Sequence, residues 1–376
     1  MRANTSSPNK PQRTGPAHGT GIETATEQHE FPVPAGTLPA VKRWVFHRFG
    51  SENLRFEESD PETPGPGQVL VRLQAASLNY RDLLILKGLY NPRLPLPQVP
   101  VSDGAGVVDE VGEGVTEFSP GDRVITHPVV GWEDGRFHRE YSRATLGGPG
   151  PGMAQEAVVV PEAALCRAPS GWSHEEAAAL PIAAVTAWSA LVTEGPVRRG
   201  QTVLTLGTGG VSIFALQIAK ALGARVIITS SSHEKLERAR ALGADVGIHR
   251  IENPAWDKAV REATGGEGAD LVVENGGAGT LNQSIRATAA GGTVAMLGAL
   301  TGLEAPVQFA PVVMRRIRIA GIMTDCRRAL RDVVDFLEKQ DLRPVLDLDY
   351  PLAELPAALD CMERGAHFGK IIIRIA

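Results

Sequence analysis

A cluster of glycines in the middle of the chain has the composition of a phosphate-binding turn. It reads Gly207, Thr208, Gly209, Gly210 and Val211. A short apolar run at 203–206 precedes it, and apolar residues at helical spacing follow it over 213–222. Glycines allow a tight turn and let a phosphate approach the backbone, and the following helix offers free N–H groups and the positive end of its dipole. The pattern favours a dinucleotide cofactor, although Ser212 stands where a third glycine is expected and a glycine triplet alone can be an ordinary turn.

The residues after the next apolar run, 225–229, could select the cofactor. An acidic residue about 20 positions after the glycines normally holds the ribose 2′-OH of NAD, but this chain has Ser230 and Ser231 there. The two hydroxyl groups and Lys235 suit a 2′-phosphate, which a carboxylate would repel. Glu234 beside Lys235 leaves NAD possible, and Lys235 could instead belong to a solvated helix face. We therefore predict NADP as the cofactor, with NAD as the alternative.

Alternating strands and helices must position these residues. After the strand–helix–strand unit at 203–229, further strands are predicted at 270–274 and 292–298, with helical segments between them. This alternation predicts an α/β fold with a doubly wound parallel sheet, in which ligands bind outside the carboxyl ends of the strands. Asn275 and Gly298 fall at such ends, so we expect them to line the cofactor.

The composition excludes several other classes of protein. A formal net charge of −5 over 376 residues argues against general nucleic-acid binding, and no apolar run approaches the roughly 20 residues that a membrane helix needs. The three cysteines are too widely spaced for a metal or disulfide pattern, which fits a reducing compartment, so we expect a cytoplasmic protein. Residues 1–40 are rich in Pro, Ser, Thr and Gly and lack an apolar signal region, which predicts a disordered N-terminal extension.

The part of the chain before the glycine cluster is mostly β, and its motifs resemble those of the medium-chain dehydrogenase/reductase superfamily. The motifs are, in order, Pro66-Gly67-Gln68-Val69-Leu70-Val71, Asn79-Tyr80-Arg81-Asp82, Gly112-Glu113-Gly114-Val115, Pro120-Gly121-Asp122-Arg123-Val124 and the glycine cluster itself. The resemblance covers about residues 41–376. It implies a GroES-like β-rich catalytic domain formed by residues 41–185 and 325–376, which is split in sequence by a Rossmann domain at 186–324. We expect the protein to act on a small-molecule substrate and to form a homodimer.

The chain departs from the zinc-dependent alcohol dehydrogenases of this superfamily at the three positions that ligate catalytic zinc. Those enzymes carry Cys, His and Cys where this chain has Asn79, Ser102 and a residue near Ile182. Catalytic zinc needs three protein ligands, usually Cys, His or carboxylate. Asp82 and Asp103 remain in this region, but we interpret them as residues that cap turns and bind backbone N–H groups. The resemblance therefore implies a site without metal.

A loop at 132–152 stands where those zinc-dependent enzymes carry four cysteines for a structural zinc, and it contains no cysteine. His127 and His138 lie near this loop in sequence, among several acidic residues. Their spacing matches no metal motif. We interpret both as surface or substrate-loop histidines.

The motifs are most similar to the zinc-independent quinone oxidoreductase branch, whose members use NADPH to reduce a conjugated C=C bond or a quinone. That resemblance implies catalytic roles for Asn79 and Tyr90, which can both hydrogen-bond a polarised carbonyl, and places Thr186, Thr324 and Lys370 beside the cofactor. Asn79 could instead be a turn residue, and Tyr90 half-buried packing. We predict hydride transfer to an enone, a quinone or a related conjugated carbonyl compound. The alternatives are alcohol dehydrogenase-type interconversion and an NADP(H)-binding sensor without turnover.

Overall fold

The structure of the protein is a computed structural model that describes residues 40–376. These residues belong to one compact unit. The predicted disordered extension at 1–40 lies outside the described residues, apart from Ala40. The predicted domain limits, 41–185 with 325–376 and 186–324, stay a prediction, although the strands separate into sheets as set out below.

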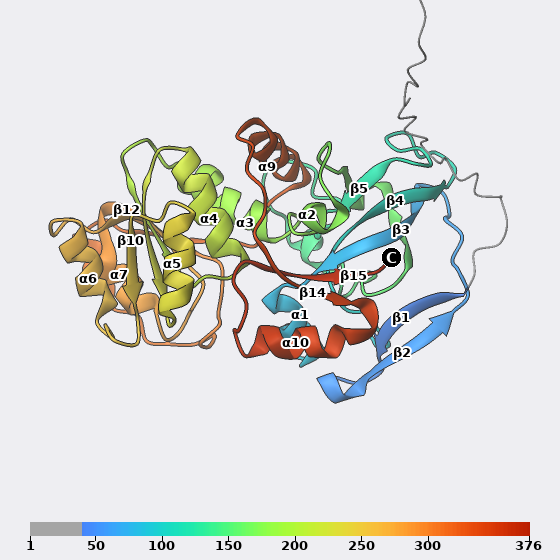
Figure 1. Cartoon of the computed structure of the whole chain (residues 1–376), viewed down its shortest axis with the longest axis horizontal. Coiled ribbons are helices and arrows are strands. Elements are labelled where there is room, and N and C mark those ends of the chain that lie inside the picture. Colours follow the sequence, from blue (N-terminus) through green and yellow to red (C-terminus); the bar gives the residue numbers. More distant parts are fainter. Residues whose placement is uncertain (1–39) are drawn as a thin grey trace, which may run out of the picture. The chain divides into compact units, whose positions relative to one another are not determined.

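Six parallel strands form one sheet (Figure 1). Their spatial order is β10 (Val246–His249), β9 (Arg225–Ser230), β8 (Thr202–Leu206), β11 (Ala269–Glu274), β12 (Thr288–Met296) and β13 (Arg318–Gly321). Counted by position in the chain, this is the order 3-2-1-4-5-6 of the Rossmann fold, with its switch point between β8 and β11. The predicted doubly wound parallel sheet is therefore confirmed.

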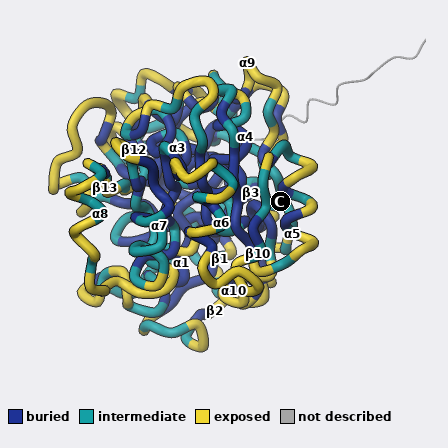
Figure 2. Tube along the Cα trace, turned by 90° about the vertical axis from the view of Figure 1, so that its left-hand side faces the viewer, coloured by how far each residue is buried: buried dark blue, intermediate teal, exposed yellow. Residues whose placement is uncertain are grey.

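Helices cover both faces of this sheet, because alternate side chains of each strand point to opposite sides. Val203 and Val226 pack in one cluster with Phe214 of α4 (Gly210–Ala221). Their neighbours Leu204 and Ile227 pack in a second cluster with residues of α6 (Trp256–Ala263). Burial on both faces explains why 203–206 and 225–229 are nearly continuous apolar runs rather than alternating ones. Figure 2 shows β12, α3 and α4 among the buried parts of the trace.

The second large sheet is mostly antiparallel and has seven strands. Along its main path the order is β14 (Leu346–Pro351), β15 (Lys370–Arg374), β3 (Gln68–Ser77), β4 (Asp103–Val111), β5 (Arg123–Thr126) and β7 (Leu165–Arg167), and β6 (Ala157–Pro161) also pairs with β3. A separate hairpin pairs β1 (Val41–Phe46) with β2 (Leu54–Ser59). β14 and β15 thus return the end of the chain to the sheet formed by its beginning, which places Lys370 beside the strand that leads to Asn79.

The remaining α-helices range from the short α2 to α9, which is slightly longer than α4. They are α1 (Tyr80–Leu86), α2 (His174–Ala178), α3 (Ala183–Trp188), α5 (His233–Ala241), α7 (Leu281–Ala287), α8 (Phe309–Met314), α9 (Arg327–Lys339) and α10 (Leu355–Glu363). The start of α2 is a capping box, in which Ser173 Oγ accepts from the N–H of Glu176 and the Glu176 carboxylate accepts from the N–H of Ser173. Within residues 40–376, every helix is too short or too polar to cross a membrane.

His127 is buried, and our interpretation of it as a surface or substrate-loop residue is wrong. It follows β5, and its Nε2 lies 3.0 Å from the carbonyl oxygen of Asp325 in the segment before α9. His138, in contrast, is exposed. Acidic neighbours in the sequence suggested a polar environment for both histidines, but β5 is an inner strand that carries the residue after it into the core.

Buried His127 should make the stability of the protein sensitive to acid. Burial lowers the pKa of His127 from 6.5 to about 4, so between these values the unfolded chain binds a proton that the folded chain does not. The free energy of unfolding therefore falls by about 1.4 kcal/mol for each unit that the pH decreases between these two pKa values. Urea unfolding at pH 7 and pH 5 should show about 2 kcal/mol more loss in the wild type than in His127→Gln. An equal pH dependence in both proteins would contradict this assignment.

The loop at 132–152 is held by aromatic packing. Trp132 is buried, and its ring centroid lies 5.1 Å from that of Phe137 and 6.0 Å from that of Tyr141. The carbonyl of Trp132 also accepts the N–H of Arg327 at the start of α9. Aromatic side chains therefore organise the segment that stands in place of a four-cysteine lobe.

Candidate functional site

The glycine turn after β8 has the backbone of a phosphate-binding turn. Gly207 has a φ of 76°, which L side chains rarely adopt. Gly209 is the N-cap of α4, so the free N–H groups of the first helical turn lie just after it. A Cβ on Gly210 would lie 2.5 Å from Cδ of Lys370. Glycine is therefore required at position 207 by conformation and at position 210 by space.

Ser212 explains the missing third glycine. It is buried in the first turn of α4, where its Oγ donates to the carbonyl of Leu206 at 2.7 Å. Asn275, directly after β11, donates from Nδ2 to the same carbonyl at 3.0 Å and to Ser212 Oγ at 2.7 Å. A serine at this position binds the last residue of β8 to the end of β11, so the two strand ends at the switch point are held together.

The other predicted cofactor residues lie around this turn or at neighbouring strand ends. Thr208 accepts the N–H of Gly369 at 2.9 Å, and Val211 lies in the first turn of α4. Gly298 follows β12, where a Cβ would lie 2.3 Å from the carbonyl oxygen of Asn275. Because glycine has no side chain, the two backbone segments can approach each other here, and the carboxyl edge of the sheet stays open to a ligand.

Two predicted threonines have little or no contact with solvent through their hydroxyl groups, Thr186 as a buried residue and Thr324 as a half-buried one. Thr186 is buried in the middle of α3. Thr324 follows β13 with a φ of 51°, and its buried Oγ1 has no hydrogen-bond partner within residues 40–376. Asn275 Oδ1 is likewise buried without a partner in that range. A dinucleotide with phosphates at the glycine turn would offer partners to such groups, so the residues present fit this cofactor.

The tip of β9 carries Ser230, as predicted, but its hydroxyl is turned into the chain. Ser230 is buried, and its Oγ accepts the N–H of Ser232 at 3.2 Å. Ser231 is exposed beside it. The ammonium group of Lys235 donates to the carbonyl oxygens of Gly365 at 2.7 Å and His367 at 2.8 Å. In this structure Lys235 therefore connects α5 to the segment before β15.

Arg250 is a candidate cofactor residue that the sequence prediction missed. Its N–H donates to the carbonyl of Ser230 at 2.8 Å, because β10 and β9 are parallel neighbours that end together. Its side chain is exposed and forms no hydrogen bond or ion pair within the described part of the chain. No strand at 246–249 is predicted from the sequence, and only β10 of the structure places this basic residue beside the tip of β9.

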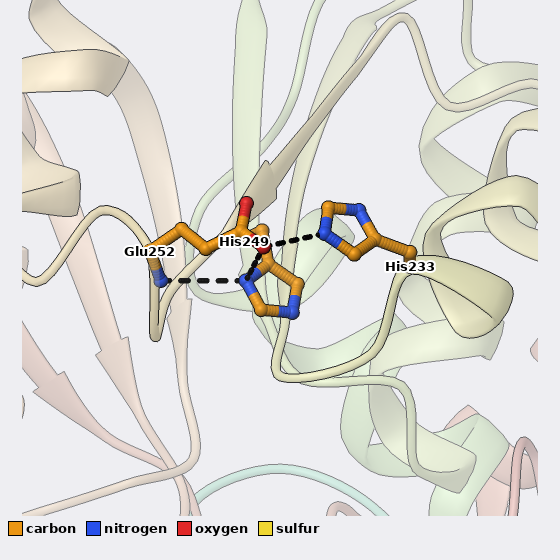
Figure 3. Close-up of side chains that lie close together, drawn as sticks. All are labelled: His233, His249 and Glu252. Carbon is orange, nitrogen blue, oxygen red and sulfur yellow. Dashed lines mark hydrogen bonds and ion pairs between the residues drawn. The ribbon is translucent and has the colours of Figure 1, made fainter.

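A cluster of two histidines and a glutamate joins the same two strand tips (Figure 3). His233 Nε2 lies 2.7 Å from Glu252 Oε1, and the His233 and His249 rings are stacked 4.1 Å apart. Two imidazoles and a carboxylate can ligate zinc, but His233 and Glu252 are exposed and His249 Nδ1 already accepts the N–H of Glu252 at 3.3 Å. These contacts indicate a structural role for the cluster, which connects β10 to the start of α5.

The region where related enzymes carry catalytic zinc contains a buried hydrogen-bond network. Asn79 is the N-cap of α1, and its backbone N–H donates to Asp82 Oδ2 at 2.8 Å. Asp82 Oδ1 accepts from Ser102 Oγ at 3.1 Å, and Ser102 in turn accepts from Arg81. Asp82 therefore caps the helix, as we interpreted it, and its burial raises its pKa. Asn79 is a turn residue as well as a candidate catalytic one.

An ammonium group from β15 lies at the centre of this network. Lys370 Nζ donates to the carbonyl of Leu78 at 2.7 Å and to Asn79 Oδ1 at 2.8 Å, and it lies 3.9 Å from Asp103 Oδ2. Burial raises the pKa of Asp103 to about 6, although the positive charge of Lys370 acts in the opposite direction. Burial also lowers the pKa of Lys370. Asp103 Oδ2 also accepts the N–H of Ile182 at 3.2 Å. The predicted cofactor residue Lys370 is thus bonded to the candidate catalytic residue Asn79.

The donor set in this region does not fit zinc. Of the three positions that would supply ligands, Asn79 offers an amide, Ser102 a hydroxyl engaged with Asp82, and Ile182 no donor side chain. The positive charge that balances the buried carboxylates comes from Lys370. Zinc sites in proteins use thiolate, imidazole or carboxylate ligands around an accessible position. The carboxylates of this region, Asp82 and Asp103, are buried and already bind backbone N–H groups, Ser102 and the Lys370 charge.

Tyr90, the second predicted catalytic residue, is separate from the network. Its ring is about half exposed, and the guanidinium of Arg81 lies 5.1 Å from the ring centroid. Arg81 also donates to Thr145 and to the carbonyl of Leu146 at 2.8 Å, so it connects α1 to the loop at 132–152. Arg81, which also donates to Ser102, connects Tyr90 to the Asn79 network.

Comparison with known proteins shows where the chain belongs. The description "Alcohol dehydrogenase GroES-like domain" matches residues 65–170, and "Zinc-binding dehydrogenase" matches residues 210–339. A zinc-type alcohol dehydrogenase-like protein of Schizosaccharomyces pombe is 42% identical over 342 residues, which are 89% of this chain and 99% of that protein. An acryloyl-coenzyme A reductase of Metallosphaera sedula is 31% identical over 327 residues, 84% of this chain and 95% of that protein.

A solved structure gives the same result. A protein described as an NAD-dependent alcohol dehydrogenase superimposes with a TM-score of 0.82 at 40% identity, covering 89% of this chain and 100% of that one. The order of motifs, the strand order and these matches agree along the whole described chain. The protein belongs to the medium-chain dehydrogenase/reductase superfamily and is an NAD(P)-dependent oxidoreductase.

Proposed function

We propose that the protein transfers hydride from NADPH to the electrophilic carbon of an enone, a quinone or a related conjugated carbonyl compound, without catalytic zinc. The observation that carries the proposal is the Lys370 ammonium group, bonded to Asn79 in the region where related enzymes ligate zinc. The 31% identity to an acryloyl-coenzyme A reductase supports an acceptor with a C=C bond conjugated to a carbonyl group.

The chain's own residues can stabilise charge on the acceptor oxygen. When bound, NADPH supplies a hydride, and negative charge then develops on the carbonyl oxygen of the acceptor. Lys370 fixes Asn79 by bonding to Oδ1, and the buried Nδ2 has no partner within hydrogen-bond distance in residues 40–376, although Asn79 lies close enough to Asp103 to lower the pKa of that carboxyl. A preoriented donor of this kind stabilises a developing oxyanion. A proton from solvent or Tyr90 completes the reduction, so that one hydride and one proton are added to the acceptor.

The tip of β9 supports NADPH rather than NADH. Ser230 and Ser231 place no carboxylate where the ribose 2′-OH of NAD is normally bound. Arg250, whose backbone N–H is bonded to Ser230, adds an exposed basic side chain at the same edge of the sheet, and arginine suits a phosphate in both charge and geometry. NAD remains the alternative cofactor, because a similar structure is described as an NAD-dependent alcohol dehydrogenase.

A substrate panel tests the proposed function. NADPH and NADH oxidation should be followed with enones, acryloyl thioesters and quinones, and NADP⁺ and NAD⁺ reduction with primary and secondary alcohols. We expect steady NADPH consumption with at least one conjugated carbonyl compound and little alcohol oxidation. Turnover with alcohols alone would assign alcohol dehydrogenase-type interconversion instead. Tight NADPH binding with no turnover across the panel would assign a sensor.

The protein should turn over without bound zinc. Elemental analysis after purification and extensive dialysis should find well under one zinc per chain, and a chelator should leave the rate of NADPH oxidation unchanged. The reason is the donor set of Asn79, Ser102 and Ile182, which is too poor to hold the ion. One zinc per chain, with activity lost on chelation and regained with zinc, would refute the metal-free mechanism.

The predicted homodimer would use the β13 edge of the parallel sheet. Within residues 40–376, β13 pairs only with β12, and Figure 2 shows exposed and intermediate parts of the trace near the labels β13 and α8. Large apolar residues are exposed on β13, on α8 and in the segments beside them. They are Leu300, Leu303, Phe309, Val313, Met314, Ile319 and Met323. An unpaired strand edge beside a large apolar patch favours pairing with a second copy of the chain.

Charged substitutions on this patch should produce monomers. Val313→Asp and Met314→Asp each place a carboxylate on an exposed residue of α8, so folding should be retained while the paired copies separate. Analytical ultracentrifugation should find a dimer for the wild type and a monomer for the variants. Ile251→Asp, at an exposed apolar residue outside this set, is the control and should stay dimeric. A monomeric wild type would end the dimer proposal.

A further inference from the structure

His367 lies at the glycine turn, and neither of its ring nitrogens has a hydrogen-bond partner in the part of the chain that the structure describes. A Cβ on Gly209, the N-cap of α4, would lie 3.7 Å from His367 Nε2. His367 Nδ1 is buried and has no hydrogen-bond partner, and Nε2 forms no hydrogen bond within residues 40–376. Imidazole normally pairs at least one nitrogen when it is largely buried. His367 Nε2 is therefore placed to donate a hydrogen bond to a ligand group that binds beside Gly209.

The segment that carries His367 is fixed to three other elements. Lys235 of α5 donates to the carbonyl of His367 at 2.8 Å. The N–H of Phe368 donates to Asp347 Oδ2 of β14 at 2.8 Å, and the N–H of Gly369 donates to the carbonyl of Thr208 in the glycine turn at 2.9 Å. These bonds hold His367 against the turn without help from its ring.

Positive charge gathers around His367. Burial, then the charges of Lys235 and Lys370, lower its pKa from 6.5 to about 4, and Asp347 is the nearby acidic group that opposes this. Arg238 also lies close, over the Phe368 ring, and is paired with Asp347. The N-terminus of α4 adds its dipole from the other side. The imidazole is therefore neutral unless an anion reaches it.

We propose that His367 donates a hydrogen bond to the diphosphate of the dinucleotide cofactor and takes up a proton when that diphosphate binds. The inference rests on the proposed use of a dinucleotide at this turn. Two phosphate charges offset the repulsion from Lys235 and Lys370 and stabilise the imidazolium form. The pKa of His367 is about 4 in the free protein and should be higher in the complex. Between these two pKa values, the affinity for the cofactor falls by up to about 10-fold for each unit that the pH rises.

ADP-ribose is the probe that isolates this step. It carries the diphosphate but lacks both the nicotinamide and the 2′-phosphate, whose own pKa near 6 would add a second proton. Calorimetry at pH 5.5 in buffers of different ionisation enthalpy measures the protons taken up on binding. The wild type should take up close to one proton, and His367→Gln, which keeps a neutral donor, should take up none. His47→Gln, an exposed histidine on another part of the chain, is the matched control and should behave as the wild type.

The variants separate the possible results. His367→Gln should bind ADP-ribose at pH 8 within a few-fold of the wild type, since both then offer a neutral donor, whereas His367→Ala should bind more weakly at every pH. Equal proton uptake by the wild type and His367→Gln would overturn the role of His367 while leaving the proposed function intact. If the wild type bound neither ADP-ribose nor NADPH, the proposed function would fail and this inference with it.

Discussion

Ser230→Asp should reverse the cofactor preference from NADPH to NADH. The new carboxylate at the tip of β9 would repel the 2′-phosphate of NADPH and accept a hydrogen bond from the ribose hydroxyl of NADH. A hydrogen bond to a charged group contributes about 1.5–3 kcal/mol, so we expect kcat/KM to fall at least about 10-fold with NADPH and to rise about 10-fold or more with NADH. The aspartate can also accept the Ser232 N–H that Ser230 Oγ accepts now, so the loop should be kept.

Arg250→Ala is the matched variant for this prediction. It removes a cation beside Ser230 without adding an acceptor for the ribose hydroxyl, so it should weaken NADPH use and leave NADH use nearly unchanged. Lys235→Ala distinguishes less clearly between effects on NADPH use and on NADH use, because Lys235 also bonds to the backbone of His367. Wild-type protein that already prefers NADH would show that the assignment of NADP is wrong.

Lys370→Met should cause the largest loss of stability and abolish most activity. Nζ is the cation next to the fully buried Asp103, and it also fixes the orientation of the Asn79 amide. Breaking a buried pair by removing one partner typically costs about 3–5 kcal/mol, because the remaining charge has no compensation. Methionine keeps the apolar stem that packs against Gly210, so the loss of free energy of unfolding reports on the ammonium group. Denaturant unfolding and NADPH oxidation measure the two effects.

A double variant distinguishes the lost charge from lost packing. Lys370→Met combined with Asp103→Asn has neither buried charge, so most of the stability should return, while activity should stay low because Asn79 is no longer oriented by Lys370. A single variant that loses less than about 1 kcal/mol would mean that Asp103 does not rely on Lys370.

Local patterns in the sequence predicted the nucleotide-binding half of this protein well. The runs at 203–206 and 225–229, with the glycines between them, predict a strand, a turn and a helix because each requirement is met by neighbouring residues. The ends of β11 near Asn275 and of β12 near Gly298 follow from the same alternation, although β12 begins and ends earlier than predicted and β10 was not predicted. The capping box at Ser173 was equally readable, since it joins residues three apart.

Contacts between distant segments were decided by the tertiary structure alone. Lys370 reaches Asn79 across 291 residues of chain, and only the return of β15 to the sheet of β3 brings them together. Arg250 lies beside Ser230 because parallel strands end at one edge, and His367 faces Gly209 because Gly369 binds the glycine turn. Residue types and spacing show which chemistry is available, but the position of a buried charge depends on which strands pair, and that is set by packing over the whole chain. For the same reason His127, among acidic neighbours in the sequence, lies in the core.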